Sequence, residues 1–398
     1  MVIRKRIIKL AALFFITAVI MLMLMQLMVN TTTSSELHIK NFYKEPENTL
    51  DVALIGCSEM YADYSAPLAY KECGFTSYNL CYESAMGCMY PSMIREFCSR
   101  QDPQLTVIEV NGFFYSKEYD KKEASVRRWV DSMEKNDNWK QTIQELVEPE
   151  ERINYYFNFL KYHSNWNVPE KLLYRIKSYY DNSKTPVSMM KSFGTRTTTR
   201  SAREGRLKPP ELTDIGEEYM KDTIACCKEL GLEQVLFIRT PHMLKLPEET
   251  DKRLRAIAEE SGYSYFNFET AAGEMGIDES TDYYNNEHLN VFGSEKFTKY
   301  IARYLCDNYT ITADHSDETD AQWKECVEYT ENAFKILGER TLDNEDYPYY
   351  EYTDLSEKEH ERIKKAMKVK EVLEKDDPDK IKEKPSPKDK HPTDKKDK

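Results

Sequence analysis

The sequence has no excess of positive charge. Its 398 residues include 56 Lys and Arg against 69 Asp and Glu, which gives a formal net charge of −13 at pH 7. A protein that binds nucleic acid generally needs a distinct basic face for the phosphates. The charge balance therefore argues against nucleic acid as a partner. The length leaves room for one large domain or two small ones.

Cysteine pairs with the spacing of a metal site are also absent. None of the nine cysteines belongs to a Cys-x-x-Cys pair, and His288 stands beside Glu287 without further ligands at a suitable spacing. We therefore expect no bound metal and no cofactor. The odd number of cysteines leaves at least one thiol unpaired. Several of them fall on apolar faces of the expected elements, where a free thiol behaves as a small hydrophobic residue.

One long hydrophobic segment is present, at residues 10–29, and only two of its residues are polar. Its length matches the ~20 residues that a membrane-spanning helix needs. Four basic residues within residues 1–9 predict a cytoplasmic amino terminus and an extracytoplasmic remainder of the chain. A cleaved signal peptide is the alternative, but its apolar core is usually only ~7–15 residues long and residues 29–32 offer no small-residue cleavage site. We therefore expect an uncleaved single-pass anchor in the cell membrane.

The two flanks of the folded part are polar. Residues 30–48 are interpreted as a stalk between the anchor and the first strand. Residues 357–398 are almost wholly charged and cannot form a core, so a disordered tail is expected there. Residues 309–356 are expected to form a helical extension outside the sheet.

Five short apolar segments alternate with helical segments in the folded part, which spans residues 49–112 and 213–308. Strands separated by helices of this length imply right-handed crossovers and a parallel sheet. The predicted strands cover residues 52–57, 76–81, 105–110, 234–238 and 265–268.

Residues 113–212 interrupt this alternation with charged, aromatic-rich helical segments and no clear strand. We interpret them as an insertion. Its aromatic residues form either the wall of a substrate cleft or plain packing against the parent sheet. Its last part, residues 194–208, is interpreted as a basic loop that either holds an anionic group or is a solvated surface.

The segment Asp51-Val52-Ala53-Leu54-Ile55-Gly56-Cys57-Ser58-Glu59 is the first strand and the turn that follows it. The carboxyl ends of parallel strands form the edge where open α/β sheets hold ligands, so Ser58 is expected at that edge. Gly56 allows the backbone to turn sharply. Taken alone, a serine in such a position is more often part of a structural turn than a nucleophile.

His288 makes a nucleophilic role for Ser58 more plausible than a purely structural one, because it lies in the loop before the last helix of the sheet domain and is expected at the same edge of the sheet. A serine hydroxyl is a poor nucleophile unless a neighbouring base accepts its proton, and a third group must fix the tautomer of that base. We therefore predict Ser58 as the nucleophile and His288 as the base. The backbone N–H groups of Ser58 and Cys81 and the side-chain amide of Asn111 are the predicted oxyanion donors.

The order of these residues resembles that of the SGNH/GDSL hydrolase superfamily. In that family a serine follows strand one, an oxyanion donor follows strand two, an asparagine follows strand three, and Asp-x-x-His precedes the last helix. The resemblance lies in Ile55-Gly56-Cys57-Ser58 and His288-Leu289-Asn290-x-x-Gly293, within residues 50–308 without the insertion. It implies a three-layer, flavodoxin-like fold whose five parallel strands have the order 2-1-3-4-5.

With its anchor, the chain is similar to the membrane-bound branch of that family in bacterial cell envelopes, such as the teichoic-acid D-alanylation and alginate O-acetylation proteins. The resemblance implies a serine acyl-esterase or O-acyltransferase that acts outside the membrane on acyl esters of an envelope polymer. The implied partners are an envelope polysaccharide or teichoic-type polymer and a membrane-bound acyl-transport protein. The alternative is a catalytically impaired relative that binds or scaffolds such a polymer.

The chain departs from the family pattern at three positions. Cys81 replaces a glycine, which keeps the backbone donor, and Asn111 lacks the aspartate that follows it in the family. Asn285 stands three residues before His288, where the family has aspartate. An asparagine can hydrogen-bond the imidazole but cannot stabilise the imidazolium by charge, and the corresponding change in a serine protease costs about 10⁴ in kcat. Asp282 is the candidate for the missing carboxylate.

The other candidates have structural interpretations. Cys57 is expected to point into the core, and His242 is expected to be a loop residue and not a second base. The remaining histidines lie in polar segments and are expected to be solvated: His38, His163, His315, His360 and His391.

Overall fold

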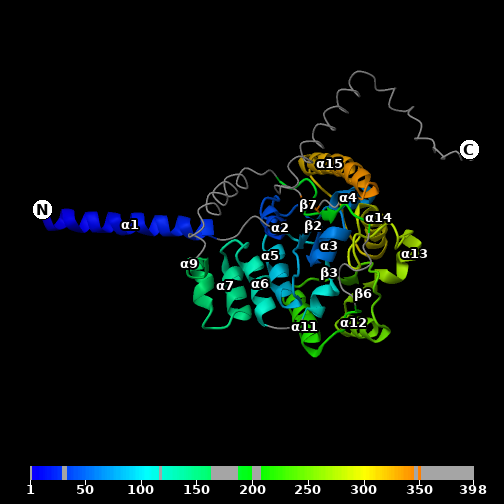
Figure 1. Ribbon diagram of the computed structural model, residues 1–398, viewed down its shortest axis with the longest axis horizontal. Helices are drawn as coiled ribbons and strands as arrows, with labels where there is room; N and C mark the ends of the chain where they lie inside the picture. Colours follow the sequence, from blue (N-terminus) through cyan, green and yellow to red (C-terminus); the bar gives the residue numbers. More distant parts are fainter. Residues whose placement is uncertain are drawn as a thin grey trace, which may run out of the picture.

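The computed structural model describes residues 2–28, 34–115, 119–162, 187–199, 208–344 and 348–350. At its centre lies a sheet of five parallel strands in the order β2-β1-β3-β5-β6 (Figure 1). The strands are β1 Val52–Gly56, β2 Ser77–Cys81, β3 Leu105–Glu109, β5 Val235–Arg239 and β6 Ser264–Asn267. The predicted α/β architecture with a parallel five-stranded sheet is therefore confirmed, and so is the order of its strands.

Helices cover both faces of this sheet. On one face α4 (Ala66–Cys73) contacts α14 (Val291–Asn308) and α15 (Asp317–Leu342), and on the other α11 (Asp214–Glu229) contacts α5 (Tyr90–Cys98) and α12 (Glu248–Glu260). Figure 1 shows α4, α14 and α15 above the strands and α11 and α12 below them. From β1 the chain first moves to β2 at one edge of the sheet, and then it crosses back through β3 and β5 to β6 at the other edge. Because each crossover is right-handed, connections that run in opposite directions place their helices on opposite faces. Shorter elements connect the layers: α3 Ser58–Asp63, α13 Ala272–Met275, η1 Gly87–Met89, η2 Val110–Phe114 and η4 Phe268–Ala271.

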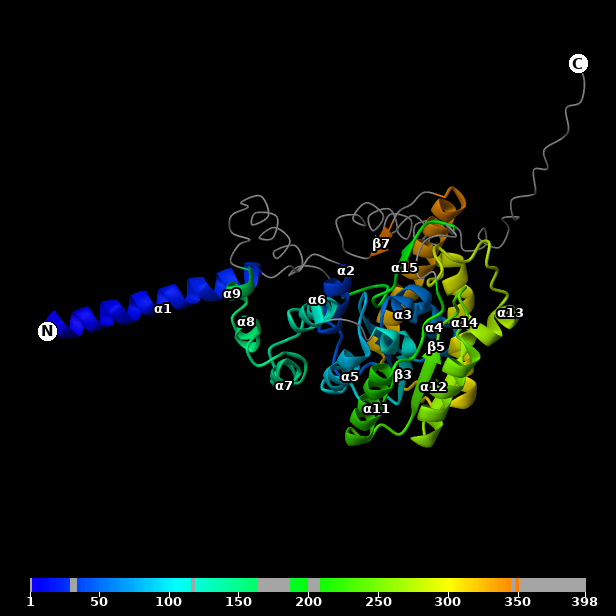
Figure 2. The ribbon, with the colours of Figure 1, turned by 60° about the horizontal axis from the view of Figure 1, so that its bottom comes forward.

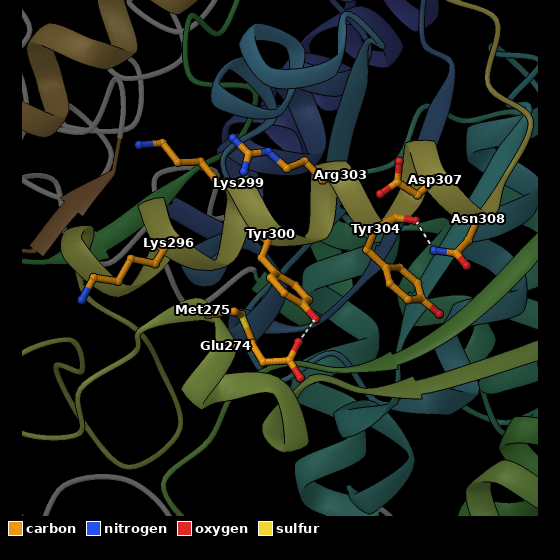
Figure 3. Close-up of a pocket in the computed structure, with 9 residues that line it drawn as sticks. All are labelled: Glu274, Met275, Lys296, Lys299, Tyr300, Arg303, Tyr304, Asp307 and Asn308. Atoms are coloured by element: carbon orange, nitrogen blue, oxygen red, sulfur yellow. Dashed lines mark hydrogen bonds between the residues drawn. The ribbon is translucent and has the colours of Figure 1, made fainter.

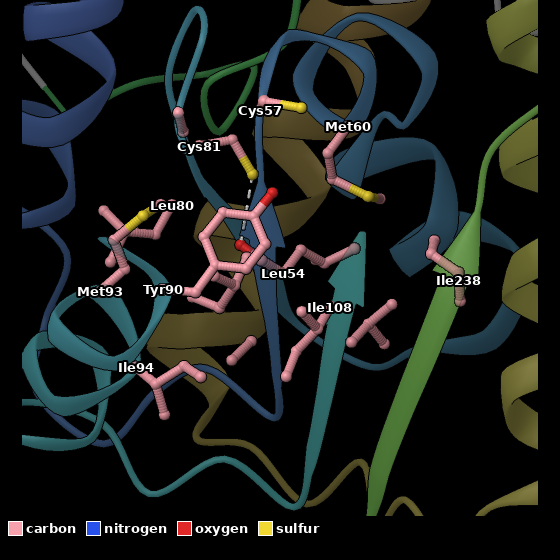
Figure 4. Close-up of a cluster of buried hydrophobic side chains, with 14 of the residues drawn as sticks. Leu54, Cys57, Met60, Leu80, Cys81, Tyr90, Met93, Ile94, Ile108 and Ile238 are labelled. Atoms are coloured by element: carbon pink, nitrogen blue, oxygen red, sulfur yellow. Dashed lines mark hydrogen bonds between the residues drawn. The ribbon is translucent and has the colours of Figure 1, made fainter. Parts of the chain in front are cut away.

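The core surrounds the central strands. Every residue of β1, β2, β3 and β5 is buried, as expected for parallel strands that are covered on both faces. Figure 4 shows Leu54, Ile108 and Ile238 from neighbouring strands, with Met93 and Ile94 of α5 beside them. Burial of each such side chain contributes roughly 1.5–3 kcal/mol. This packing fixes the carboxyl ends of the strands relative to one another.

The segment that was expected to be a polar stalk belongs to the folded part. Residues 34–42 form α2 (Ser34–Phe42), which contacts β2. Phe42 is fully buried, and its ring stacks on Phe97 with 5.1 Å between ring centroids. The carboxylate of Glu45 accepts a hydrogen bond of 2.8 Å from the buried ammonium of Lys191. The folded part therefore begins near residue 34, and not near residue 49.

The insertion is largely helical, as predicted. Its described helices are α6 Tyr119–Val130, α7 Asp137–Leu146, α8 Arg152–Tyr156 and α9 Asn158–Tyr162. Trp129 of α6 stacks on Tyr82 and donates a hydrogen bond of 2.8 Å from Nε1 to Ser92 Oγ. This aromatic residue thus packs against the parent domain and does not line a cleft.

One prediction for the insertion is wrong, because it contains a strand. β4 (Gly194–Arg196) pairs antiparallel with β7 (Pro348–Tyr350), so Gly194 lies opposite Tyr350. Residues 309–356 are correspondingly not only helical. A three-residue strand has no periodicity to detect, and its partner lies about 150 residues away. Most of the predicted basic loop and the whole charged tail lie outside the described residues.

Helix α1 (Val2–Met28) extends away from the folded part (Figure 1). Its segment from Ile3 to Met25 is long and apolar enough to cross a membrane or to act as a signal sequence. Most of its side chains are exposed, and α9 is the element of the insertion that it contacts.

Candidate active site

Ser58 is the first residue of α3 and directly follows β1 at the carboxyl edge of the sheet. Gly56 makes this turn possible through close packing, and not through a positive φ angle. A Cβ atom at Gly56 would lie only 2.9 Å from Glu109 Cβ and 3.1 Å from Met60 Cβ. The Ser58 side chain is 8% exposed, and its hydroxyl donates a hydrogen bond of 3.1 Å to Oε2 of Glu59.

His288 lies in the loop before α14, and local hydrogen bonds shape that loop. Oδ1 of Asn290 accepts N–H groups at the start of α14 and so caps the helix. A Cβ atom at Gly293 would lie 2.3 Å from the carbonyl oxygen of Asp282, so the glycine lets the loop and the helix approach closely. These contacts explain why Asn290 and Gly293 accompany His288 in the sequence.

Asn285 fixes the tautomer of His288. Its Oδ1 accepts hydrogen bonds from the backbone N–H groups of Glu287 at 2.8 Å and of His288 at 2.9 Å, which identifies this atom as the amide oxygen. The same oxygen lies 2.9 Å from Nδ1 of His288. Because an amide oxygen only accepts, Nδ1 carries the proton and Nε2 is the basic nitrogen. The ring stacks on Tyr284 with 5.1 Å between centroids, is 8% exposed, and has no hydrogen-bond partner for Nε2 within the described part of the chain.

One buried hydrogen bond joins the serine helix to the histidine loop. Oδ1 of Asp63, at the end of α3, accepts the backbone N–H of Leu289 at 2.8 Å. Six helical residues span about 9 Å, so this bond links the far end of the helix that begins with Ser58 to the residue that follows His288. Burial raises the pKa of the Asp63 carboxyl well above its usual value. The Ser58 hydroxyl is directed to Glu59 and not to His288 in this structure.

Asp282 is placed differently from the expected orienting carboxylate. Its Oδ2 accepts hydrogen bonds from Lys296 Nζ at 2.6 Å and from the backbone N–H of Asp278 at 2.8 Å. Asp282 therefore organises its own loop, and the contact to the imidazole comes from Asn285.

A buried cluster of acidic and thiol groups lies behind Ser58. Cys57 Sγ donates to Oε2 of Glu59 at 2.8 Å and lies 3.3 Å from Oε2 of Glu109. Burial, followed by the charges of these two carboxyl groups, raises the pKa of Cys57 well above its usual value, so this thiol is not an activated nucleophile. Burial and the Glu59 charge raise the pKa of Glu109 to about 8. Glu109 therefore keeps its proton to a higher pH than an exposed glutamate does.

Cys57, Glu59 and Glu109 are also a candidate set of metal ligands, because their Sγ and carboxylate oxygen atoms lie within 4.8 Å of one another. The surrounding donors do not suit a cation. The side-chain amide of Asn111 and the thiol of Cys57 donate to Glu59, and Oε1 of Glu109 accepts the backbone N–H of Asn111 at 2.9 Å. Hydrogen bonds therefore account for this cluster without an ion.

Asn111, the predicted oxyanion donor, is held in one orientation. Its Oδ1 accepts a hydrogen bond of 2.8 Å from Nη1 of Arg239, and its Nδ2 donates to Oε1 of Glu59. Nε of Arg239 donates to Oε1 of Glu269 at 2.9 Å, and this pair is almost completely buried. The Asn111 amide N–H is thus fixed toward the Ser58 end of the site, where Glu59 now occupies it.

Cys81, the other predicted donor, ends β2 and pairs in register with Gly56. Its side chain is buried, and Sγ donates to the carbonyl oxygen of Leu54 at 3.5 Å, as Figure 4 shows. Only its backbone therefore remains for an oxyanion.

Two histidines that were expected to be solvated are buried. Burial lowers the pKa of His38 to about 3, and Nε2 of His315 lies 2.7 Å from Oδ2 of Asp51. Both expectations are wrong, because α2 and the segment before α15 pack against the sheet domain. His242 lies in the loop after β5, where its Nδ1 is 2.8 Å from the carbonyl oxygen of Thr240. His163, His360 and His391 lie outside the described residues.

Sequence reasoning missed the polar residues that support the site: Glu59, Glu109, Arg239 and Glu269. A signal for two of them was present. Glu109 and Arg239 each end a strand that is otherwise apolar and buried, and a charge in such a position requires a partner.

Two hollows on the described surface lie away from this edge. One has a volume of about 480 Å³ and lies between α13 and α14, where Tyr300 donates to Glu274 at 2.8 Å (Figure 3). The other has about 420 Å³ and lies between α4, α14 and α15. Neither is lined by Ser58 or His288, and neither contributes to the chemistry of the site.

Comparison with known proteins adds no identification. The sequence matches no protein-family model, and no curated protein was found to match it.

Proposed function

We propose that this chain is a membrane-anchored, extracytoplasmic serine acyl-esterase or O-acyltransferase of the SGNH type. Its substrate class is the acyl esters of a cell-envelope polymer. The observation that carries the proposal is the state of His288, whose Nδ1 proton is held by Asn285 and whose Nε2 is free to accept a proton beside the helix that begins with Ser58. This is the arrangement that a general base for a serine requires.

The reaction begins when Ser58 Oγ attacks the acyl carbonyl carbon and its proton moves to Nε2 of His288. The tetrahedral intermediate collapses, the ester C–O bond breaks, and the imidazolium returns its proton to the leaving polymer oxygen. Water or a second hydroxyl group then attacks the acyl-serine with His288 again as the base, which gives hydrolysis or transfer. Asn285 keeps the imidazole in the correct tautomer but adds no negative charge, so the imidazolium is stabilised less than by an aspartate.

Glu59 controls whether this reaction can start. It accepts the Ser58 hydroxyl and the Asn111 amide, which are the proposed nucleophile and an oxyanion donor. Both donors must leave Glu59 when an ester binds. The proton of Ser58 then faces His288, and Nδ2 of Asn111, still held through Arg239, faces the developing oxyanion.

The location and the polymer substrate rest on α1 and on the family resemblance. A transferase would also require a membrane-bound partner that delivers an activated acyl group across the membrane.

Active-site labelling tests the proposal on the purified full-length protein in detergent. A fluorophosphonate reacts with activated serines, so we expect labelling of the wild type and none of Ser58→Ala or His288→Ala. Ser280→Ala, in an exposed part of the histidine loop, is the control that should keep full labelling. Labelling that persists in Ser58→Ala would contradict the proposed nucleophile.

The second candidate function is polymer binding without catalysis. It is favoured by the neutral Asn285 and by the hydrogen bond that holds the Ser58 hydroxyl on Glu59. Absence of labelling in the wild type, together with retained binding of a teichoic-type polymer, would support this function.

A further inference from the structure

The insertion carries a stripe of exposed apolar side chains on α8 and α9. Ile153, Phe157 and Leu160 are 48%, 52% and 46% exposed. Ile153 lies on α8 and Leu160 on α9, whereas Phe157 lies in the turn between them, where its backbone leaves the helical conformation (φ −121°, ψ 77°). The N–H of Phe157 donates to Ile153 O at 2.9 Å and the N–H of Leu160 donates to Phe157 O at 2.8 Å, so hydrogen bonds close this turn. We call these three residues the α8–α9 stripe.

The stripe lies where α1 joins the folded part. Helix α1 contacts α9, and Figures 1 and 2 both show α9 beside the inner end of α1 with the rest of α1 extending away. Met25 of α1 is only 8% exposed, whereas Phe14 in the middle of the helix is 78% exposed. The packed end of α1 is therefore the end next to the insertion.

The depth of this contact matches the surface of a bilayer. The apolar segment from Ile3 to Met25 has 23 residues, or about 35 Å of helix, which fills the ~30 Å hydrocarbon core. Met25 closes that segment, so α9 packs against α1 at the boundary between acyl chains and headgroups. Exposed aliphatic and aromatic side chains are stable at this boundary.

The charged groups of α8 and α9 are already bound within the protein. Arg152 donates to the backbone carbonyl oxygens of Val147 at 2.9 Å and Gln144 at 2.7 Å, and Lys161 pairs with Glu123 at 2.6 Å. The charged residues left exposed beside α8 are the acidic Glu148 and Glu150, so contact of the stripe with lipid does not depend on anionic headgroups.

We propose that the α8–α9 stripe inserts into the headgroup–acyl boundary of the membrane that holds α1. The stripe then fixes the folded part against the bilayer as a second contact, in addition to the spanning helix. The proposal requires that α1 is retained in the mature protein, and it is independent of catalysis at Ser58.

Quenching by brominated lipid tests the proposal on the full-length protein in phosphatidylcholine vesicles. Phe157→Trp adds a fluorophore to the stripe, and Ile215→Trp on α11 is the matched control, because Ile215 is 47% exposed and α11 lies far from α1 in both ribbon views. After subtraction of the wild-type signal, acyl-chain bromination should reduce the emission of the Phe157→Trp residue by at least about half. The emission of the Ile215→Trp residue should change by less than about a tenth. The difference is expected because an apolar side chain at the interface enters the headgroup–acyl boundary, where it meets the brominated chains, whereas a side chain in water does not.

A photo-crosslinking phenylalanine analogue at position 157 gives a second readout with little effect on folding. A phosphatidylcholine adduct, detected by mass spectrometry, supports the proposal. A crosslink to a second copy of the chain, equal quenching at both tryptophan positions, no quenching at position 157, or a mature chain without α1 would each overturn it. Fluorophosphonate labelling of the same samples reports on the proposed function separately.

Discussion

Replacement of Asn285 by aspartate tests the most unusual feature of the proposed site. Oδ1 of Asn285 accepts three N–H groups, two from the backbone and one from the imidazole. A carboxylate accepts the same three donors in the same geometry, because aspartate and asparagine have nearly the same shape. The substitution therefore adds a negative charge beside His288 without removing a hydrogen bond.

The added charge should raise kcat. A carboxylate there lies about 4 Å from the centre of the imidazolium, and two unit charges at that separation interact by about 4 kcal/mol at an effective dielectric constant of ~20. Each ~1.4 kcal/mol is a factor of ten, so the upper limit is about 10³ in kcat. Asn285 is only half-buried, and solvent screens part of the interaction. We therefore expect a gain of about 10² for Asn285→Asp.

The assay is hydrolysis of a small aryl acetate by the purified full-length protein. Ser280→Asp is the control, because it adds the same charge in an exposed part of the same loop. An unchanged or lower kcat in a folded Asn285→Asp protein, with His288→Ala inactive, would show that the charge beside the base is not limiting. Activity in His288→Ala would remove the base itself from the mechanism.

Four further substitutions test the site and the fold. Asp282→Asn weakens the contact with Lys296, so it should lower the free energy of unfolding by about 1.5–3 kcal/mol in denaturant unfolding and change kcat for ester hydrolysis less than about threefold. A large loss of kcat in a protein of normal stability would show that Asp282 is the orienting group. Glu59→Gln removes the charged acceptor that competes with His288 for the Ser58 proton, so it should raise the rate of fluorophosphonate labelling by about tenfold. Loss of labelling in a folded protein would indicate that Glu59 is itself the base. The raised pKa of Glu109 means that the folded state binds a proton more tightly than the unfolded state, so the contribution of Glu109 to stability should fall as the pH rises from 4.5 to about 8. The unfolding midpoint of Glu109→Gln should therefore rise relative to that of the wild type over this range, and a difference that stays constant with pH would contradict the raised pKa. Phe42→Ala should lower the free energy of unfolding by about 3–5 kcal/mol because Phe42 is fully buried, whereas Lys44→Ala should lower it little. Equally small effects of both substitutions would show that this segment is a stalk and not part of the core.

The sheet was predictable because each of its strands is encoded locally. Parallel strands that are buried on both faces are short, continuous apolar segments, and the helical segments between them fix the direction of each crossover. The placement of Ser58 and His288 was predictable for the same reason, since one follows β1 and the other precedes α14.

The support of the base was not predictable in this way. Asn285 and Asp282 are three and six residues before His288, and either could reach the ring in an extended loop. The folded loop decides between them, because the side-chain oxygen of Asn285 accepts two backbone N–H groups and is thereby directed at Nδ1, while Asp282 binds Lys296 of α14.

Periodicity and the direction of the chain determined the parallel sheet, the apolar amino-terminal helix and the edge on which Ser58 and His288 lie, whereas the order of the strands was predicted from the family resemblance. Tertiary structure decided where the buried polar groups find partners. Glu59 holds Asn111, Arg239 joins Asn111 to Glu269, and β4 pairs with β7, all through contacts between residues that are far apart in the sequence. The cost of burying an unpaired polar group fixes such contacts only when the chain has folded around them.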